Sequence, residues 1–337
     1  MNRTEERIIT ALHARLNEKE IEMMNFNDFC NEVKNSIIAW LPEEFCSATA
    51  ELKMVEKSNG IYLTGLIVKK EDSNIAPTIY LDKYYDMYND GKYWEDIMEQ
   101  IAAVRTASEH TSLDVSKIQD YEEIREYIFP QIVGKKEWNE HFLEDKPYTE
   151  LFDLAVVFVL DVTELFEMNA ETGRYTVVIK NDLMKSWDKT KGDLLFQSIN
   201  NIRSSENFKP VFRTMRSTLG ELVGVVPGYD EDVEDNIDNE IMFVLSNERK
   251  MYGASVVLAI NTLRDIYDKI GEFVMIPSSI HEWLILRKRD VQDLDEISQM
   301  IMEINETQVE KHDRMSDHPY IFDGEDMRTY EKRDDNT

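Results

Sequence analysis

The stretch Ala50–Lys69 reads AELKMVEKSNGIYLTGLIVK and contains the clearest folding signal of the chain. Two short strand-like runs, Ala50–Lys57 and Ile61–Lys69, flank the dipeptide Asn59-Gly60. An Asn-Gly pair suits a type I′ turn, because both central residues of that turn need positive φ angles. The stretch therefore predicts an antiparallel β-hairpin.

Short strand-like runs recur along the chain, and several lead into segments with helical spacing of apolar residues. Three β-branched runs stand directly before such a segment: Thr78–Leu81, Thr176–Ile179 and Ser255–Leu258. Their unequal offsets exclude a solenoid, and a degenerate strand-turn-strand-helix repeat is one reading of them. The patterns predict an α+β fold, with antiparallel hairpins and sheets flanked by helices.

Two apolar segments carry a less direct signal. Residues Leu154–Leu160, LAVVFVL, are apolar throughout, so periodicity alone cannot separate a buried strand from a buried helix. We favour a strand because the run is moderately rich in β-branched residues. Apolar spacing over 117–132 predicts a helix, and Ala254–Leu258 reads as a strand.

Patterning also suggests how the chain is divided. Residues 1–25 read as an N-terminal helical extension, and the last residues, 323–337, as a polar tail. The poorly patterned stretch around 143–151 is the best candidate boundary between an N-terminal α+β half, 26–145, and a C-terminal α+β half, 146–322.

The composition bounds the class of protein. Of 337 residues, 42% are apolar and 10% aromatic, which is too many for a wholly disordered chain. The two cysteines are too few for a disulfide scaffold, and they suit a reducing compartment. A membrane span needs roughly 18 consecutive apolar residues, and the longest run here is Leu154–Leu160. The first residues also lack the order of a signal peptide, so we expect a cytoplasmic protein.

The charge of the chain bears on its partners. Thirty-eight Lys and Arg against 67 Asp and Glu give a formal net charge of −29. Such a surface repels nucleic acids and anionic membranes, because phosphate binding depends on Lys and Arg. We therefore expect no membrane association and no direct binding of nucleic acid. The chain also lacks a Walker A sequence, a dinucleotide-binding GxGxxG and a CxxC pair, so we expect no cofactor.

The stretch Pro277–Trp283 contains the strongest catalytic candidates: Ser279, His281 and Glu282. A serine hydroxyl becomes nucleophilic beside a base, and that base needs an orienting partner. In a strand, however, Glu282 would point away from the face that holds the other two side chains. The alternative interpretation is a tight turn in which the serine hydroxyls bind the backbone.

Two histidines and an acid near the C-terminus are the candidate metal ligands: His312, Asp317 and His318. Imidazole and carboxylate groups suit zinc or another divalent ion. The spacing matches no helical HExxH pattern, so we expect a structural role and no bound metal.

A run rich in tyrosine suggests a contact surface. Tyr84, Tyr85 and Tyr88 fall on one side of a predicted helix. If exposed, they would supply contact area for a protein partner at low entropic cost. The alternative is that they cover a core.

Several short strings, in their order along the chain, resemble an uncharacterised bacterial family catalogued as domain of unknown function 5688. The strings are Asp72–Leu81, Phe152–Ala155, Leu245–Asn247 with Gly253-Ala254, Pro277–Glu282, Asn305 with Thr307–Val309, and Ser316–His318 with Tyr320. The similarity runs from about Phe26 to Tyr330, which favours one continuous module. It implies no activity and assigns a role to no residue.

The leading hypothesis is therefore a non-catalytic protein-interaction or regulatory module. One rival is a hydrolase that uses Ser279 and His281, which would need these side chains at hydrogen-bond distance in a concave site. The other rival is an acidic nucleic-acid mimic that blocks a basic partner, which would need a stripe of acids and salt-sensitive binding.

Overall fold

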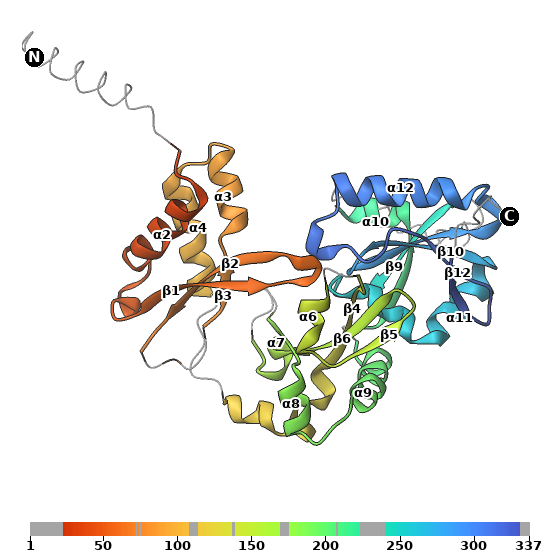
Figure 1. The fold of residues 1–337 in the computed structure, drawn as a ribbon, viewed down its shortest axis with the longest axis horizontal. Helices are drawn as coiled ribbons and strands as arrows, with labels where there is room; N and C mark the ends of the chain where they lie inside the picture. The colour runs from red at the N-terminus through yellow and green to blue at the C-terminus, as the bar shows by residue number, and fades with distance from the viewer. Residues whose placement is uncertain are drawn as a thin grey trace, which may run out of the picture. The chain divides into compact units, whose positions relative to one another are not determined.

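The computed structural model describes residues 23–71, 73, 76–107, 114–136, 139–168, 175–206, 208–222, 237 and 240–330. The described residues form two compact units, which are described separately (Figure 1). Unit 1 takes its residues from Met1–Val55 and Leu63–Ser112, and unit 2 from Glu56–Tyr62 and Leu113–Thr337. Residues 1–22, which include most of the predicted helical extension 1–25, lie outside the described residues. Residues 331–337, the end of the predicted polar tail, also lie outside them.

Unit 1 contains a three-stranded sheet in the order β1-β2-β3. Its elements are β1 (Thr49–Glu56), β2 (Tyr62–Lys69), β3 (Thr78–Tyr80), α2 (Phe26–Ser36), α3 (Asp82–Asn89), α4 (Trp94–Ala107), η1 (Ile37–Trp40) and η2 (Glu43–Phe45). Phe29 and Val33 of α2 are fully buried with Ile97 and Ile101 of α4 and Leu66 of β2. The core of this unit is therefore made by helices packed with the sheet.

The predicted β-hairpin is confirmed by β1 and β2. Asn59 and Gly60 at its tip have φ angles of 61° and 65°, as the Asn-Gly signal requires. The tip, Glu56–Tyr62, belongs to unit 2. There the main-chain N–H of Asn59 donates to Oδ1 of Asn139 at 2.5 Å, and Nδ2 of Asn139 donates to Oδ1 of Asn59 at 2.7 Å.

Unit 2 contains two antiparallel sheets. The smaller has the order β4-β6-β5, with β7 also paired to β6. Its strands are β4 (Ile128–Gly134), β5 (Tyr148–Leu151), β6 (Leu154–Asp161) and β7 (Thr176–Val178). The larger has the order β13-β12-β10-β11-β9-β8. Its strands are β8 (Pro210–Thr214), β9 (Met242–Asn247), β10 (Phe273–Ser279), β11 (Glu282–Arg287), β12 (Tyr320–Phe322) and β13 (Met327–Thr329).

Helices cover these sheets and connect their strands (Figure 1). They are α5 (Tyr121–Ile124), α6 (Glu140–Glu144), α7 (Val162–Leu165), α8 (Asn181–Ser186), α9 (Lys191–Ser204), α10 (Met215–Leu222), α11 (Ile260–Ile270), α12 (Leu294–Thr307) and the 3₁₀ turns η3 (Ser58–Gly60), η4 (Val115–Gln119), η5 (Arg125–Tyr127), η9 (Gly253–Leu258), η10 (Lys288–Asp290) and η11 (Lys311–Asp313). On the larger sheet, Val274 and Ile276 pack against Ile301 of α12. The predicted α+β class is confirmed.

Strand β6 confirms the strand predicted at LAVVFVL and explains its lack of alternation. Phe158 belongs to the main core, which both sheets of unit 2 share, whereas Val157 packs on the opposite face with Phe142 of α6. Because both faces of the strand are buried, both sets of alternating side chains must be apolar.

Two predicted elements are wrong. The segment predicted as helix 117–132 begins with short helical turns but continues as strand β4. Pro130 disfavours helix at the residue before it, and the apolar residues around it pair with β6 instead. The strand predicted at Ala254–Leu258 is part of η9, where the Trp283 indole N–H donates to the Ala254 carbonyl at 2.8 Å. The run Ser255–Leu258 is therefore helical, whereas the runs Thr78–Leu81 and Thr176–Ile179 contain the strands β3 and β7.

The predicted boundary near residue 145 falls inside unit 2, where β5 begins at Tyr148 and pairs with β6. The two units divide at 112/113, except that the hairpin tip, Glu56–Tyr62, belongs to unit 2. Across the part of the chain that the structure describes, no helix combines the length and the apolarity that crossing a membrane requires.

Candidate functional site

The predicted catalytic residues lie in the tight connection between β10 and β11. Ser279 pairs with Glu282, so the turn itself consists of two residues. The Ser279 hydroxyl accepts a hydrogen bond from the main-chain N–H of His281 at 3.1 Å, and the Ser278 hydroxyl donates to Glu282 at 3.2 Å. Both serine side chains thus contact atoms of the turn.

The imidazole of His281 contacts other elements. Its Nδ1 accepts a hydrogen bond from the main-chain N–H of Tyr252 at 3.1 Å, and its ring stacks on the Tyr252 ring. Its Nε2 lies 3.7 Å from Oδ1 of Asp313. Among the described contacts, none joins this imidazole to the Ser279 hydroxyl. The hydrolase stays a prediction that lacks the hydrogen bond its mechanism needs.

The three candidate metal ligands face different partners. Nε2 of His312 lies 3.6 Å from Asp313, whereas Asp317 binds Lys136 and Asn305, and His318 binds Asp153. Within the described ranges, no group of three or more His, Cys, Asp or Glu side chains is arranged to hold a metal ion.

Asp153 is the centre of a polar cluster that sequence reasoning missed. It lies in the turn between β5 and β6 and accepts hydrogen bonds from Ser316 at 2.9 Å, from His318 Nε2 at 3.1 Å and from the Tyr320 hydroxyl at 2.5 Å. Burial alone would raise the pKa of this carboxyl, but the bonds from His318 and Tyr320 lower it to about 2. Asp153 is therefore held as a carboxylate.

The same contacts fix the protonation of its partners. Burial lowers the pKa of His318, but the bond to Asp153 outweighs that effect and the net shift is upward. Burial and the adjacent Asp153 charge both raise the pKa of Tyr320. The strings Phe152–Ala155 and Ser316–Tyr320, far apart in the sequence, meet in this cluster. Both strings are among those that carry the family resemblance, but the resemblance assigned no role to them.

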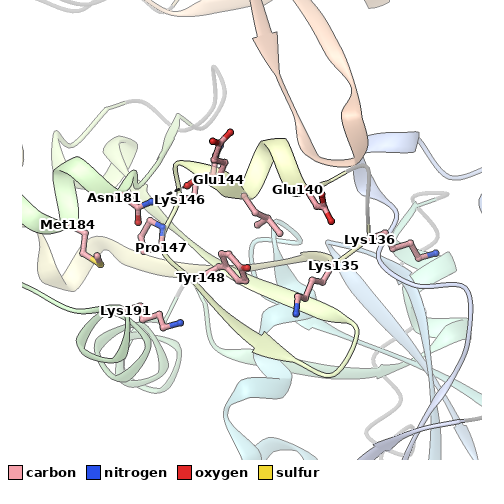
Figure 2. Close-up of a pocket in the computed structure, with 11 residues that line it drawn as sticks. Lys135, Lys136, Glu140, Glu144, Lys146, Pro147, Tyr148, Asn181, Met184 and Lys191 are labelled. Carbon is pink, nitrogen blue, oxygen red and sulfur yellow. Dashed lines mark hydrogen bonds between the residues drawn. The ribbon is translucent and has the colours of Figure 1, made fainter.

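A cavity of about 730 Å³ opens in unit 2 beside this cluster (Figure 2). It is lined by four lysines, Lys135, Lys136, Lys146 and Lys191, and by Glu140, Leu143, Glu144, Pro147, Tyr148, Asn181 and Met184. We call these eleven residues the lysine pocket. The main-chain N–H of Lys135 donates to the carbonyl of Asp153 at 2.8 Å, which connects the pocket wall to the Asp153 cluster.

Two of the lysines, Lys135 and Lys191, act on one carboxylate. Nζ of Lys135 lies 2.6 Å from Glu150, and the hydrogen bond from Lys135 lowers the pKa of Glu150, with a smaller contribution from the charge of Lys191. In Figure 2 both side chains extend below the ring of Tyr148, from different elements. Lys191 is exposed and forms no ion pair with another described residue. The pocket lining thus combines four lysines with two acids, Glu140 and Glu144.

The other two lysines have structural contacts. Lys146 is buried, donates to the carbonyl of Phe142 and to Asp145, and lies 4.0 Å from the centre of the Phe142 ring. Lys136 binds Asp317, and this bond and one from Asn305 lower the pKa of Asp317 against the effect of its burial. No sequence pattern indicated this pocket, because its lysines span 57 positions and only the fold brings them together.

The three tyrosines proposed as a contact surface pack in unit 1. Tyr84 is buried, and Tyr85 and Tyr88 lie against the core beside Phe29. The Tyr85 hydroxyl donates to the carbonyl of Met24 at 3.2 Å, and the Tyr88 hydroxyl accepts from the N–H of the same residue at 3.3 Å. Their role in binding a partner stays a prediction.

Comparison with known proteins identifies the family. The model of the Family of unknown function (DUF5688) matches residues 26–324, most of the chain, so the chain belongs to that family as the resemblance suggested. No curated protein and no solved structure matches the chain.

Proposed function

We propose that this member of the DUF5688 family is a non-catalytic regulatory module of the cytoplasm, which binds a small organic anion in the lysine pocket and signals to protein partners. One observation carries the proposal: a cavity of about 730 Å³ is lined by four lysines, of which Lys191 is exposed and forms no ion pair with another described residue. Cavities of this size are typical of small-ligand sites.

The lining of the pocket favours a particular class of ligand. The Glu150 side chain is 60% exposed, and exposed ion pairs contribute little energy, so a ligand anion can replace it beside Lys135. Leu143, Pro147 and Met184 add apolar surface. The ligand that fits is an organic anion, with a carboxylate or phosphate group on an apolar body.

The lysines are suited to binding more than to chemistry. A nucleophilic or basic lysine needs a lowered pKa, so that it loses its proton near neutral pH. The hydrogen bond to Glu150 instead raises the pKa of Lys135, which keeps it a cation. Neither rival, the hydrolase or the nucleic-acid mimic, has a specific contact in its favour among the described residues.

The proposal is tested with phenyl phosphate, which combines an anion with an apolar ring, and with neutral benzyl alcohol as control. We expect phenyl phosphate to raise the melting temperature progressively with its concentration, since a ligand stabilises the state that binds it. Lys191→Ala and Lys135→Ala should remove most of the shift, whereas Lys185→Ala, at an exposed position on α8, should keep it. A shift that survives both pocket substitutions, or hydrolysis of phenyl phosphate, would contradict a non-catalytic anion site.

A further inference from the structure

Strand β8 is an edge of the larger sheet in unit 2. It pairs with β9, from Pro210 opposite Asn247 to Thr214 opposite Phe243. Within the described residues, no other strand pairs with β8. An edge strand of this kind presents main-chain N–H and C=O groups that another strand can bind.

The register shows which groups point outward. The N–H of Glu248 donates to the carbonyl of Lys209 at 3.2 Å, so these opposite residues form a hydrogen-bonded pair. Such pairs alternate along an antiparallel ladder. Val211 and Arg213 therefore bond to β9, and the main-chain groups of Phe212 face away from it. Pro210, which has no N–H, also occupies an outward position, where proline is tolerated.

Space for a further strand lies along this edge. A cavity of about 570 Å³ is lined by residues 209–213 on one side and by α11 on the other, including Ile266 and Lys269. Neighbouring strands lie about 4.8 Å apart, so an added strand needs an open groove directly beside the edge. A sheet edge next to a helix provides main-chain hydrogen bonds on one wall and side-chain contacts on the other.

The charge of this groove is opposite to that of the whole chain. Its lining has four basic residues, Arg203, Lys209, Arg213 and Lys269, and two acidic ones, Glu248 and Asp265. The complete sequence has 38 basic and 67 acidic residues. A local basic excess in a strongly acidic protein favours an acidic segment over a basic one.

We propose that the edge of β8 and helix α11 form a docking groove for an acidic, extended peptide segment of a partner protein. The segment adds to the larger sheet as a further strand, with its main chain bonded to Phe212 and its acids near Lys209 and Lys269. This site is distinct from the lysine pocket, so the two proposals stand or fall separately.

The test uses the full chain and a labelled heptapeptide, Glu-Val-Glu-Val-Glu-Val-Glu, with the matching Lys-Val peptide as control. We expect saturable binding of the acidic peptide alone, and slower hydrogen exchange of the Phe212 amide when it binds. Two sets of N-methylated peptides are compared, one methylated at the odd-numbered amides and the other at the even-numbered amides. One set should lose binding and the other should keep it, because only alternate amides face the edge.

Charge reversal adds a protein-side readout. Lys209→Glu with Lys269→Glu should weaken binding by roughly tenfold, equivalent to about 1.4 kcal/mol, whereas Lys185→Glu on α8 should leave it unchanged. Equal binding of both N-methylated sets would show attraction by charge alone and overturn the proposal. Self-association that protects the Phe212 amide without peptide would also overturn it, because a second copy would then occupy the edge.

Discussion

His318 presents both of its ring nitrogens to hydrogen-bond acceptors: Nε2 lies 3.1 Å from the Asp153 carboxylate and Nδ1 lies 3.2 Å from the Pro319 carbonyl. A neutral imidazole has only one N–H, so both contacts are satisfied together only by the imidazolium form. In this state His318 has no lone pair with which to accept a proton. The pair of His318 and Asp153 therefore joins two parts of unit 2, and His318 in this state is unsuited to general-base catalysis.

The first prediction concerns this imidazolium. The pKa of His318 is raised above its usual 6.5 in the folded protein, so its contribution to stability is complete below that value and is lost as the pH rises through the folded pKa. We therefore expect the free energy of unfolding by urea to fall as the pH rises above 6.5. His318→Gln should show a smaller decrease, because His141, whose pKa is also raised by its hydrogen bond to Glu56, still contributes, and His312→Gln should keep the full decrease. An unchanged pH profile in His318→Gln would refute the assignment.

The second prediction concerns Asp153 and has the opposite sign. Its pKa falls from 3.8 to about 2 on folding, so the carboxylate stabilises the fold above pH 3.8 and loses its effect as the pH falls towards 2. A shift of this size corresponds to at most about 2.5 kcal/mol. Asp153→Asn should be less stable than the wild type at pH 7 by about this amount, and the difference should shrink in acid denaturation. A constant difference at all pH values would contradict it.

The third prediction concerns a buried ion pair. The Arg249 side chain is 3% exposed, binds Asp161 and Glu164, and lies over the ring of Phe208. Arg249→Met would remove the guanidinium that binds the Asp161 carboxylate, which is 1% exposed. We expect a loss of about 3–5 kcal/mol in urea unfolding. The exposed pair of Arg328 with Glu272 is the control, and Arg328→Met should cost less than about 1 kcal/mol. Equal losses would show that burial does not matter here.

The fourth prediction concerns Gly253, at the start of η9. A Cβ atom there would lie 2.2 Å from Oγ of Ser246 and 2.4 Å from the carbonyl oxygen of His281. Because one of these is a main-chain atom, Gly253→Ala should destabilise the protein by about 1–3 kcal/mol. Gly192→Ala in α9 meets its nearest atom at 3.6 Å and should be neutral or stabilising. Thermal unfolding of the two variants compares them, and a stable Gly253→Ala would show that η9 can move away from the turn.

The elements that sequence reasoning identified are those whose signal is local. Asn59 and Gly60 carry the hairpin in two adjacent residues, and the composition of LAVVFVL favours a strand. The errors arose where tertiary contacts decide the structure. Val256 and Val257 have strand propensity, but η9 buries them in a helical turn against the larger sheet. The run Ile128–Gly134 has helical spacing, yet pairing with β6 makes it a strand.

The functional groups show the same limit. The turn at Ser279 and His281 was recognisable because its residues are adjacent, and the alternative interpretation, hydroxyls bound to the backbone, matches the contacts of Ser279. The Asp153 cluster and the lysine pocket consist of single residues from distant segments. The turn between β5 and β6 and the placement of Ser316–Tyr320 bring the residues of the Asp153 cluster together.

Unit 2 is discontinuous in sequence, because it includes the hairpin tip, Glu56–Tyr62. Nδ2 of Asn59 donates to the carbonyls of Lys311 and Arg314, at 2.6 and 2.8 Å, in addition to its exchange with Asn139. A truncated gene product that starts at residue 113 would lack Asn59 and its hydrogen bonds to these three partners. Removal of the first third of the chain would thus damage the remaining two thirds, and gene dissection should graft Glu56–Tyr62 onto any such fragment.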